Sequence, residues 1–244
     1  INTVLFDTPS AAAYTVGTGA VGSQSLTLGN GGAITTSSTV TNGQTVNAAL
    51  VLGTDRTAQT YTVSNNATDP ATALTLAGGI SGAASGGTAG AKTLAIVGAG
   101  DTAITGGITT GGAAALTVTK SGSGTLDFAP GSALSFNSLA TTGGATNVNG
   151  ALGTGSGTAS VTVSGAGTTL KFGSVSQTLS SLTIGAGATV IFTSGTASGA
   201  LTGGGGGGKA PSFDGGSAVV PEPGTLGLLL VGALGLLNRR RRQE

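Results

Sequence analysis

Short runs in which one polar residue stands between two apolar residues recur through the second half of the chain. This two-residue period is that of a β-strand, whose successive side chains point to opposite faces. Neighbouring triplets often start 8 to 12 residues apart, glycine-rich segments separate them, and no helical period appears from residue 92 to 194. The pattern predicts short strands that bury the outer pair and leave the central residue in water. The triplets are Leu116–Val118, Leu126–Phe128, Leu134–Phe136, Val161–Val163, Leu170–Phe172 and Leu182–Ile184.

Short strands at this spacing are typical of a β-sandwich, a β-barrel or a β-solenoid. We favour the solenoid, because the triplets are short for sandwich strands and because Gly, Ala, Ser and Thr stack well at repeated corners. Aromatic residues make up 3% of the chain, too few for the core of many sandwiches. Stacked coils would bury one apolar column that no single repeat could bury alone. The predicted fold class is therefore all-β, a β-solenoid with Gly-rich corners.

We predict less regular β-strand repeats over residues 1–90 and the regular solenoid repeats over residues 91–200. Asn42-Gly43 is a strong tight-turn signal between two strand-like runs, and the Gly/Ala/Ser-rich stretch 78–90 predicts a loop. The candidate strands in this part are Thr3–Phe6, Tyr14–Val16, Ser25–Leu28, Thr39–Thr41, Thr45–Leu52, Thr60–Ser64 and Ala73–Leu76.

Two longer segments, Ser121–Phe136 and Phe172–Phe192, resemble the β-strand repeats of autotransporter-type exported passenger proteins. The resemblance rests largely on Gly, Ser, Thr and Leu composition. It implies a right-handed parallel β-helix.

The end of the chain has a different composition from the rest. Residues 201–219 form a Gly-rich linker, with six consecutive glycines at Gly203–Gly208 and a flexible tether over Gly203–Ser217. Near the start of residues 220–244 stand Pro221, Glu222 and Pro223, which predict a stiff, extended and accessible segment.

An apolar run, Leu226–Leu237, follows and ends just before a cluster of four arginines, Arg239, Arg240, Arg241 and Arg242. The run predicts one hydrophobic C-terminal α-helix in a membrane, with the arginines on the cytoplasmic side. Gly224 to Leu237 is 14 residues, whereas a perpendicular span needs roughly 20. The arginines can reach the interface while the bilayer thins locally, so a membrane helix remains the favoured interpretation over a buried helix.

This tail resembles the PEP-CTERM sorting signal of exported bacterial proteins, which has the same three parts in the same order. The resemblance covers about the last 25 residues. It implies processing by exosortase, a membrane-embedded transpeptidase-like protease. By resemblance, Pro221, Glu222 and Pro223 are the recognition motif and Leu226–Leu237 is a transient anchor. The membrane stop signal that the resemblance implies consists of Arg239, Arg240, Arg241 and Arg242.

The same resemblance implies export to the cell surface or medium. A chain exported in this way enters through an N-terminal leader, which the sequence beginning at Ile1 does not show. We therefore expect a fragment or a processed product.

Composition excludes several functions. Upstream of Pro221 the chain has five basic residues against six aspartates, so it offers no basic face for nucleic acid. It has no Cys, hence no disulfide framework, and no His, the commonest general base and transition-metal ligand. We predict neither a cofactor nor a metal site, and no catalytic residues.

Three segments match known chemical motifs only in part. Gly203–Lys209 has the spacing of a phosphate-binding loop, but Ala210 and Pro211 stand where a hydroxyl residue and a helix start are needed. Gly17–Gly22 matches the dinucleotide fingerprint by letter but leads into a strand, so it predicts a turn. Gly98–Asp101 is one copy of part of a calcium-binding repeat that works only when stacked.

The body aspartates are isolated in sequence, and no Glu accompanies them. Glycoside hydrolysis needs two carboxylates roughly 5 to 10 Å apart, and no base or nucleophile here is activated by a neighbour. Asp55 and Asp69 are turn residues by context, and Asp127 should point outward. We predict that the protein is not an enzyme.

Three functions stay open. The first is a structural or adhesive protein of the cell surface or extracellular matrix. The second is a polysaccharide-binding or polysaccharide-degrading module, with exopolysaccharide as a partner. The third is a fragment of a longer passenger. A cluster of Asp with Lys or Tyr in one groove would favour the second, and a smooth surface of Thr, Ser and Gly the first.

Overall fold

The structure is a computed structural model that describes residues 1–53, 55–69, 72–83, 88–131, 133–153 and 159–193, and the backbone of 197–203. These residues form 22 strands and, within the same ranges, no helix. None of the described segments is therefore a helix long and apolar enough to cross a membrane. The prediction of an all-β body is confirmed.

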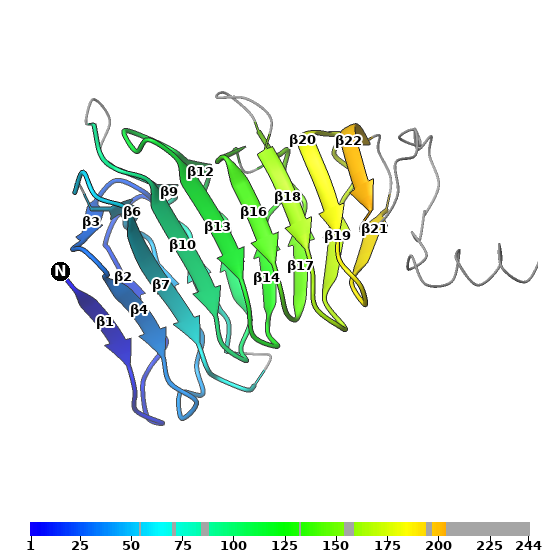
Figure 1. Cartoon of the computed structure of the whole chain (residues 1–244). Helices are drawn as coiled ribbons and strands as arrows, with labels where there is room; N and C mark the ends of the chain where they lie inside the picture. Colours follow the sequence, from blue (N-terminus) through cyan, green and yellow to red (C-terminus); the bar gives the residue numbers. More distant parts are fainter. Residues whose placement is uncertain are drawn as a thin grey trace, which may run out of the picture.

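The strands lie in three parallel sheets, and the chain visits the sheets in turn (Figure 1). Sheet A contains β1 (Thr3–Phe6), β4 (Ala33–Thr36), β7 (Gln59–Asn65), β10 (Lys92–Val97), β13 (Leu116–Lys120), β16 (Ser138–Thr141), β18 (Ala159–Val163), β20 (Gln177–Ile184) and β22 (Ala197–Gly203). Sheet B contains β2 (Thr15–Val16), β5 (Gln44–Val46), β8 (Leu74–Leu76), β11 (Thr102–Ile104), β14 (Thr125–Phe128), β17 (Ala145–Val148), β19 (Thr169–Phe172) and β21 (Thr189–Phe192). Sheet C contains β3 (Ser25–Leu28), β6 (Ala49–Leu52), β9 (Ile80–Ser81), β12 (Ile108–Thr109) and β15 (Leu134–Ser135).

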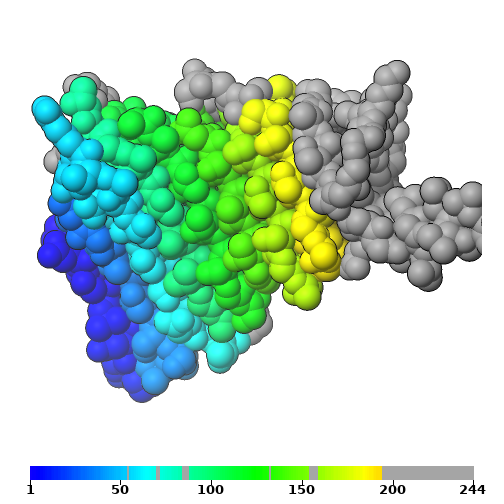
Figure 2. Space-filling view, in the orientation of Figure 1, coloured from blue at the N-terminus to red at the C-terminus, as the bar shows by residue number. Residues whose placement is uncertain are grey.

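One passage through the sheets, here called a circuit, packs directly on the next. The colours of Figure 2 accordingly follow one another in bands from the N-terminal end of the molecule. The later circuits are shorter than the early ones: Thr3 pairs with Ala33, 30 positions on, whereas Thr117 pairs with Ser138, 21 positions on. Sheet C ends at β15, which a single bridge joins to Leu152, so the described later circuits alternate between sheets A and B.

The core lies between the sheets and consists of inward side chains stacked from circuit to circuit. In most strands a buried residue alternates with a half-buried or exposed one, as in Thr125–Phe128 and Thr189–Phe192. Because the registers are continuous, one residue from each strand of sheet B joins a single inward column. Its members are Val16, Val46, Leu76, Ile104, Phe128, Val148, Phe172 and Phe192. Such stacking buries an apolar column that no single circuit could bury alone.

All six predicted triplets bury their outer residues and leave the central residue half-buried or exposed. Five lie entirely within strands, and the sixth begins at β15 and ends at Phe136, just after it. This part of the sequence prediction is confirmed. The division at residue 90 stays a prediction, and β7 pairs with β10 across it.

Several predictions for residues 1–90 are wrong in detail. Thr39–Thr41 is not a strand, and the strand of that circuit is Ala33–Thr36. Asn42-Gly43 does not form the predicted turn between two strands, because the run before it, Thr39–Thr41, is not a strand. Asn42 instead donates through Nδ2 to the carbonyl of Ala11. The predicted strand 45–52 is two strands, β5 and β6, and the predicted loop 78–90 contains β9.

Glycines at the corner between sheets A and B allow the circuits to approach closely. Gly98 and Gly122 both have positive φ, +112° and +82°. A Cβ on Gly122 would collide with the carbonyl oxygen of Gly98, and one on Gly98 with that of Asn65. Both the backbone conformation and the contact therefore require glycine.

Two buried glutamines join successive circuits through their side-chain amides. Gln44 donates through Nε2 to the carbonyl of Ala12 (3.0 Å) and accepts at Oε1 from the N–H of Tyr14 (3.1 Å). Gln177 likewise bonds the carbonyl of Gly150 (3.0 Å) and the N–H of Leu152 (2.9 Å). In each case the amide pairs with two backbone groups two residues apart, as a neighbouring strand would.

Candidate functional site

The predicted sorting site lies outside the described residues. This applies to Pro221, Glu222 and Pro223, to the apolar run Leu226–Leu237 and to the linker from residue 204 onward. It applies equally to the four residues of the predicted stop signal, Arg239, Arg240, Arg241 and Arg242. The phosphate-loop-like segment is outside the described residues after Gly203. The structural evidence on function therefore comes from the β-sheet body.

Two of the body aspartates, Asp55 and Asp101, each hold a neighbouring segment by a hydrogen bond. Asp55 accepts from the N–H of Thr57 (2.8 Å) and from Asn30, and the bonds from Thr57 are the main reason that its pKa is lowered. Asp101 accepts at Oδ1 from the N–H of Thr125 (2.7 Å). Within the described ranges, no three His, Cys, Asp or Glu side chains come together as metal ligands would.

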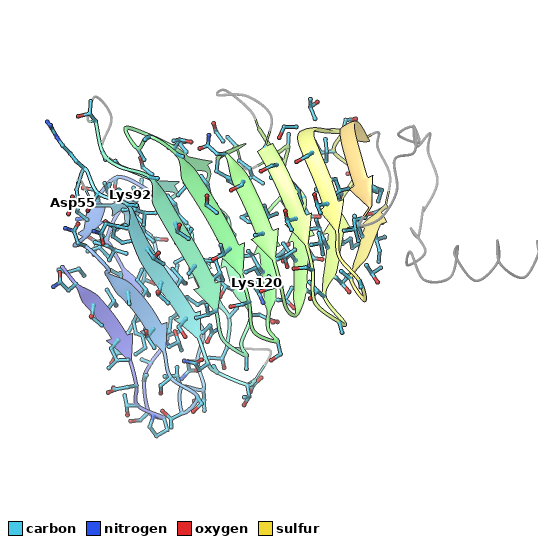
Figure 3. All side chains as sticks on the ribbon, viewed as in Figure 1. Asp55, Lys92 and Lys120 are labelled. Carbon is cyan, nitrogen blue, oxygen red and sulfur yellow. The ribbon has the colours of Figure 1, made fainter. Side chains whose placement is uncertain are left out.

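Lys92 and Asp55 lie beside each other in the corner before β7 (Figure 3). The Lys92 side chain is 1% exposed, and its Nζ donates to the backbone carbonyls of Asp55 (2.7 Å) and, more weakly, Thr57 (3.4 Å). The ammonium thus joins β10 to the loop of the preceding circuit. This is the geometry of a structural clamp, with the nitrogen turned away from solvent.

Lys120 lies at the corner between sheets A and B (Figure 3). It is the last residue of β13, whereas Lys92 is the first residue of β10. It is 2% exposed and stands in register between Ile96 and Thr141, among inward side chains. Its Nζ donates to the carbonyls of Ser121 (3.1 Å), Gly122 (2.9 Å) and Gly143 (3.2 Å). Burial lowers the pKa of Lys120, and the nearby charge of Asp101 opposes this shift only in part.

We expect Lys120 to make the stability of the body depend on alkaline pH. Because its pKa is below 10.5 in the folded chain, the unfolded chain binds more protons between the folded pKa and 10.5. The free energy of unfolding should therefore rise with pH in that window through this group. Lys120→Met should remove the rise, as measured by urea unfolding of the full chain at several pH values.

Two comparisons isolate the effect of Lys120. Burial raises the pKa of Tyr61 above 10.0, so Tyr61 lowers stability as pH rises above 10.0, in the opposite direction. The variant is therefore compared with wild type at each pH, which cancels Tyr61. Lys171→Met removes an exposed ammonium and serves as the matched control. Identical pH dependence in Lys120→Met and wild type would contradict the assignment.

Sheet A presents an uncharged face of hydroxyl side chains. Across β7, β10, β13, β16, β18 and β20 the register aligns six hydroxyl residues in one outward row: Thr60, Thr93, Thr117, Ser138, Ser160 and Ser181. The adjacent row consists of Thr62, Ala95, Thr119, Ala140, Thr162 and Thr183. Neither row contains a charged or aromatic residue. Ser138 donates to Thr117 across the strands (3.0 Å).

Sheet B presents a charged row instead. Asp127, Asn147 and Lys171 are consecutive register partners on β14, β17 and β19. All three project from the outer face, where Lys171 is exposed and the other two are half-buried. The sequence correctly placed Asp127 outward, but it did not identify this row, because the alignment of residues 127, 147 and 171 requires the register. The two-residue period alone indicates that each of them faces outward.

The glycine motif near the N-terminus is a turn, as predicted. Gly17, Gly19 and Gly22 all have positive φ, and the segment connects β2 to β3. No helix start follows it, so it lacks the context of a dinucleotide site.

One family model matches the chain: the PEP-CTERM protein-sorting motif, over residues 219–242. The match includes the Pro-Glu-Pro triplet, the apolar run and the arginine cluster. No curated protein and no solved structure matches the chain. The body is thus an all-β protein of parallel sheets, and its C-terminus is similar to a sorting signal. This motif implies an exported protein that exosortase sorts at the membrane.

Proposed function

We propose that the chain is an exported, non-enzymatic protein of the cell envelope, processed by an exosortase-type enzyme at Pro221–Pro223. The match to the PEP-CTERM motif over residues 219–242 is the observation that carries this proposal. The Gly-rich linker supports it, because such a segment would let a membrane enzyme reach the triplet without unfolding the sheets.

The apolar run Leu226–Leu237 serves as a transient anchor in the inner membrane. Its many leucines suit a helix in lipid, and the four consecutive arginines Arg239–Arg242 hold its end on the cytoplasmic side. Processing then releases the body to the cell surface or the medium. The run is shorter than the roughly 20 residues of a perpendicular span, so the bilayer thins around it while the arginines reach the interface.

The body acts as a structural or adhesive element, which we interpret as a right-handed parallel β-solenoid. The chain visits three parallel sheets in turn, and each strand of sheet A is hydrogen-bonded to the sheet A strand of the next circuit. Crossovers between parallel strands of one sheet are right-handed in nearly all proteins. The uncharged hydroxyl face of sheet A favours a structural role in matrix or coat.

The mass of the mature C-terminus tests the proposal. Protein isolated from the native cell envelope or medium should lack the apolar run and the arginines, ending near Pro221–Pro223. The intact mass gives the position of cleavage directly. A mature chain that still ends at Glu244 would contradict processing and would make the tail a permanent anchor or no anchor.

A second function, binding of polysaccharide by the body, is favoured by the row Asp127, Asn147 and Lys171. It places a carboxylate, an amide and an ammonium on one outward face. The row contains one carboxylate, whereas glycoside hydrolysis uses two. Binding is therefore a better interpretation of this surface than cleavage.

A further inference from the structure

Charged side chains are rare in the strands, and their distribution is uneven. The strands contain four: Lys92, Lys120, Asp127 and Lys171. The first two are buried and bond backbone carbonyls. The other two both project outward, both lie on sheet B, and both belong to the same register row, with Asn147 between them.

The register fixes the geometry of this row. Neighbouring strands are about 4.8 Å apart, so Asp127 and Lys171 are separated by about 10 Å across β17. This is the distance between their backbones, which a lysine side chain can span, but no ion pair joins the two residues in the described part of the chain. Lys171 makes no hydrogen bond or ion pair within the described part of the chain, and its side chain is exposed. Its ammonium is free to meet a ligand.

The carboxylate of Asp127 is held in one orientation. Asn149 donates from Nδ2 to its Oδ1 (2.9 Å), and no described residue bonds Oδ2. In the adjacent outward row, Thr125 and Thr169 place hydroxyls beside Asp127 and Lys171. We call Asp127, Asn147, Lys171, Thr125 and Thr169 the polar patch.

We propose that the polar patch binds an extended, uncharged, hydroxyl-rich glycan that runs across the strands of sheet B. This proposal deepens the second candidate function and does not depend on sorting at the tail. A sugar hydroxyl both donates and accepts, so it can bond a carboxylate at one point and an ammonium at another. One sugar unit of an extended chain has about the length of one strand spacing, so successive sugars meet successive strands.

The charges of the patch select against other ligands. A polyanion would meet Asp127, and a polycation would meet Lys171, so each is repelled at one end of the row. An apolar partner would leave both charges desolvated without compensation. A neutral polymer of hydroxyl groups satisfies both ends. The hydroxyl face of sheet A lacks charged groups and offers only neutral hydrogen bonds, which are weaker.

Binding to insoluble neutral polysaccharides tests the proposal. The full chain, in a polyoxyethylene detergent without a sugar headgroup, is mixed with cellulose, curdlan or mannan, and the unbound fraction is measured after centrifugation. Wild type should be depleted by at least one of the three. The double variant Asp127→Ala/Lys171→Ala should lose about tenfold or more in affinity, from the loss of charge-assisted hydrogen bonds.

The matched control is Thr119→Ala/Thr162→Ala, which changes two outward residues of sheet A and should bind as wild type. Circular dichroism should show the same β-spectrum for all three proteins. Binding of wild type should persist when salt is raised, because the ligand is neutral. Two results would overturn the proposal: no depletion by any of the three polysaccharides, even if a polyanion such as calcium alginate binds, or equal depletion of wild type and double variant. Failure here leaves cleavage at the tail as a separate question, answered by the C-terminal mass.

Discussion

Replacing Pro221, Glu222 and Pro223 by alanine should abolish processing, so that nearly all of the protein remains as uncleaved chain in the membrane. The triplet is the part of the matched motif that an enzyme could recognise, because two prolines fix an extended backbone with few competing conformations. Alanine keeps the chain length but removes both this stiffness and the carboxylate. The apolar run and the arginines are unchanged, so insertion itself should continue. Immunoblots of membrane, surface and medium fractions measure the outcome.

A triple alanine replacement of Pro211, Ser212 and Phe213 is the matched control, because it changes the same number of residues upstream of the matched region. That variant should be processed as wild type. If the triplet variant reached the surface in mature form at the wild-type level, the triplet would have no role in recognition. If wild type were itself uncleaved, the whole sorting proposal would be wrong, whatever the variants did.

Local sequence predicted the strands well where the two-residue period was uninterrupted. Leu170-Lys171-Phe172 shows why: the outer residues are both buried and Lys171 is exposed, as alternation requires. The prediction was wrong at Thr39–Thr41, where Val40 is the only apolar residue and no alternation supports a strand. Ala33–Thr36 was missed because only Ile34 among its inward residues is strongly apolar; the other, Thr36, is buried as well.

Buried charged residues show a different limit of prediction from sequence. Lys120 continues the alternation of Leu116 and Val118, so the period places it inward, against the usual preference of lysine for water. Only the stacked carbonyls of Ser121, Gly122 and Gly143 explain how its ammonium can be buried there. Two of these belong to its own corner and the third to the next circuit, and that juxtaposition depends on register.

The two candidate sites also differ in how far they can be recognised from the sequence. The tail could be recognised from sequence, because its three parts are contiguous and ordered from residue 221 to 242. The polar patch could not, because Asp127, Asn147 and Lys171 are 20 and 24 positions apart in circuits of unequal length. A shift of one residue in either pairing would turn an outward side chain inward. Long-range pairing, which sequence does not encode locally, therefore decides whether the patch exists.

The same continuity of register makes Phe172 a sensitive core position, and Phe172→Ala should lower the free energy of unfolding by about 3–5 kcal/mol. Phe172 is fully buried, stands between Val148 and Phe192 in the inward column, and stacks on Phe192 with ring centroids 4.9 Å apart and an interplanar angle of 16°. Its strand, β19, is hydrogen-bonded on both sides, to β17 and β21. The backbone therefore cannot move in to fill the cavity, which keeps the cost near the upper end of the range for such truncations.

Urea unfolding of the full chain, followed by circular dichroism, measures the loss, and Ile191→Ala is its matched control. Ile191 lies on β21, next to Phe192, but its side chain is on the outer face and half-buried, so its truncation should cost about 1 kcal/mol or less. Circuits contact mainly their neighbours, so unfolding can spread from the weakened circuit. Hydrogen exchange should accordingly quicken first in β19 and β21 and least in β4 and β7. Equal, small losses in both variants would mean that the inward column is not a continuous packed core at this point, and the interpretation of the body as stacked circuits would then be wrong there.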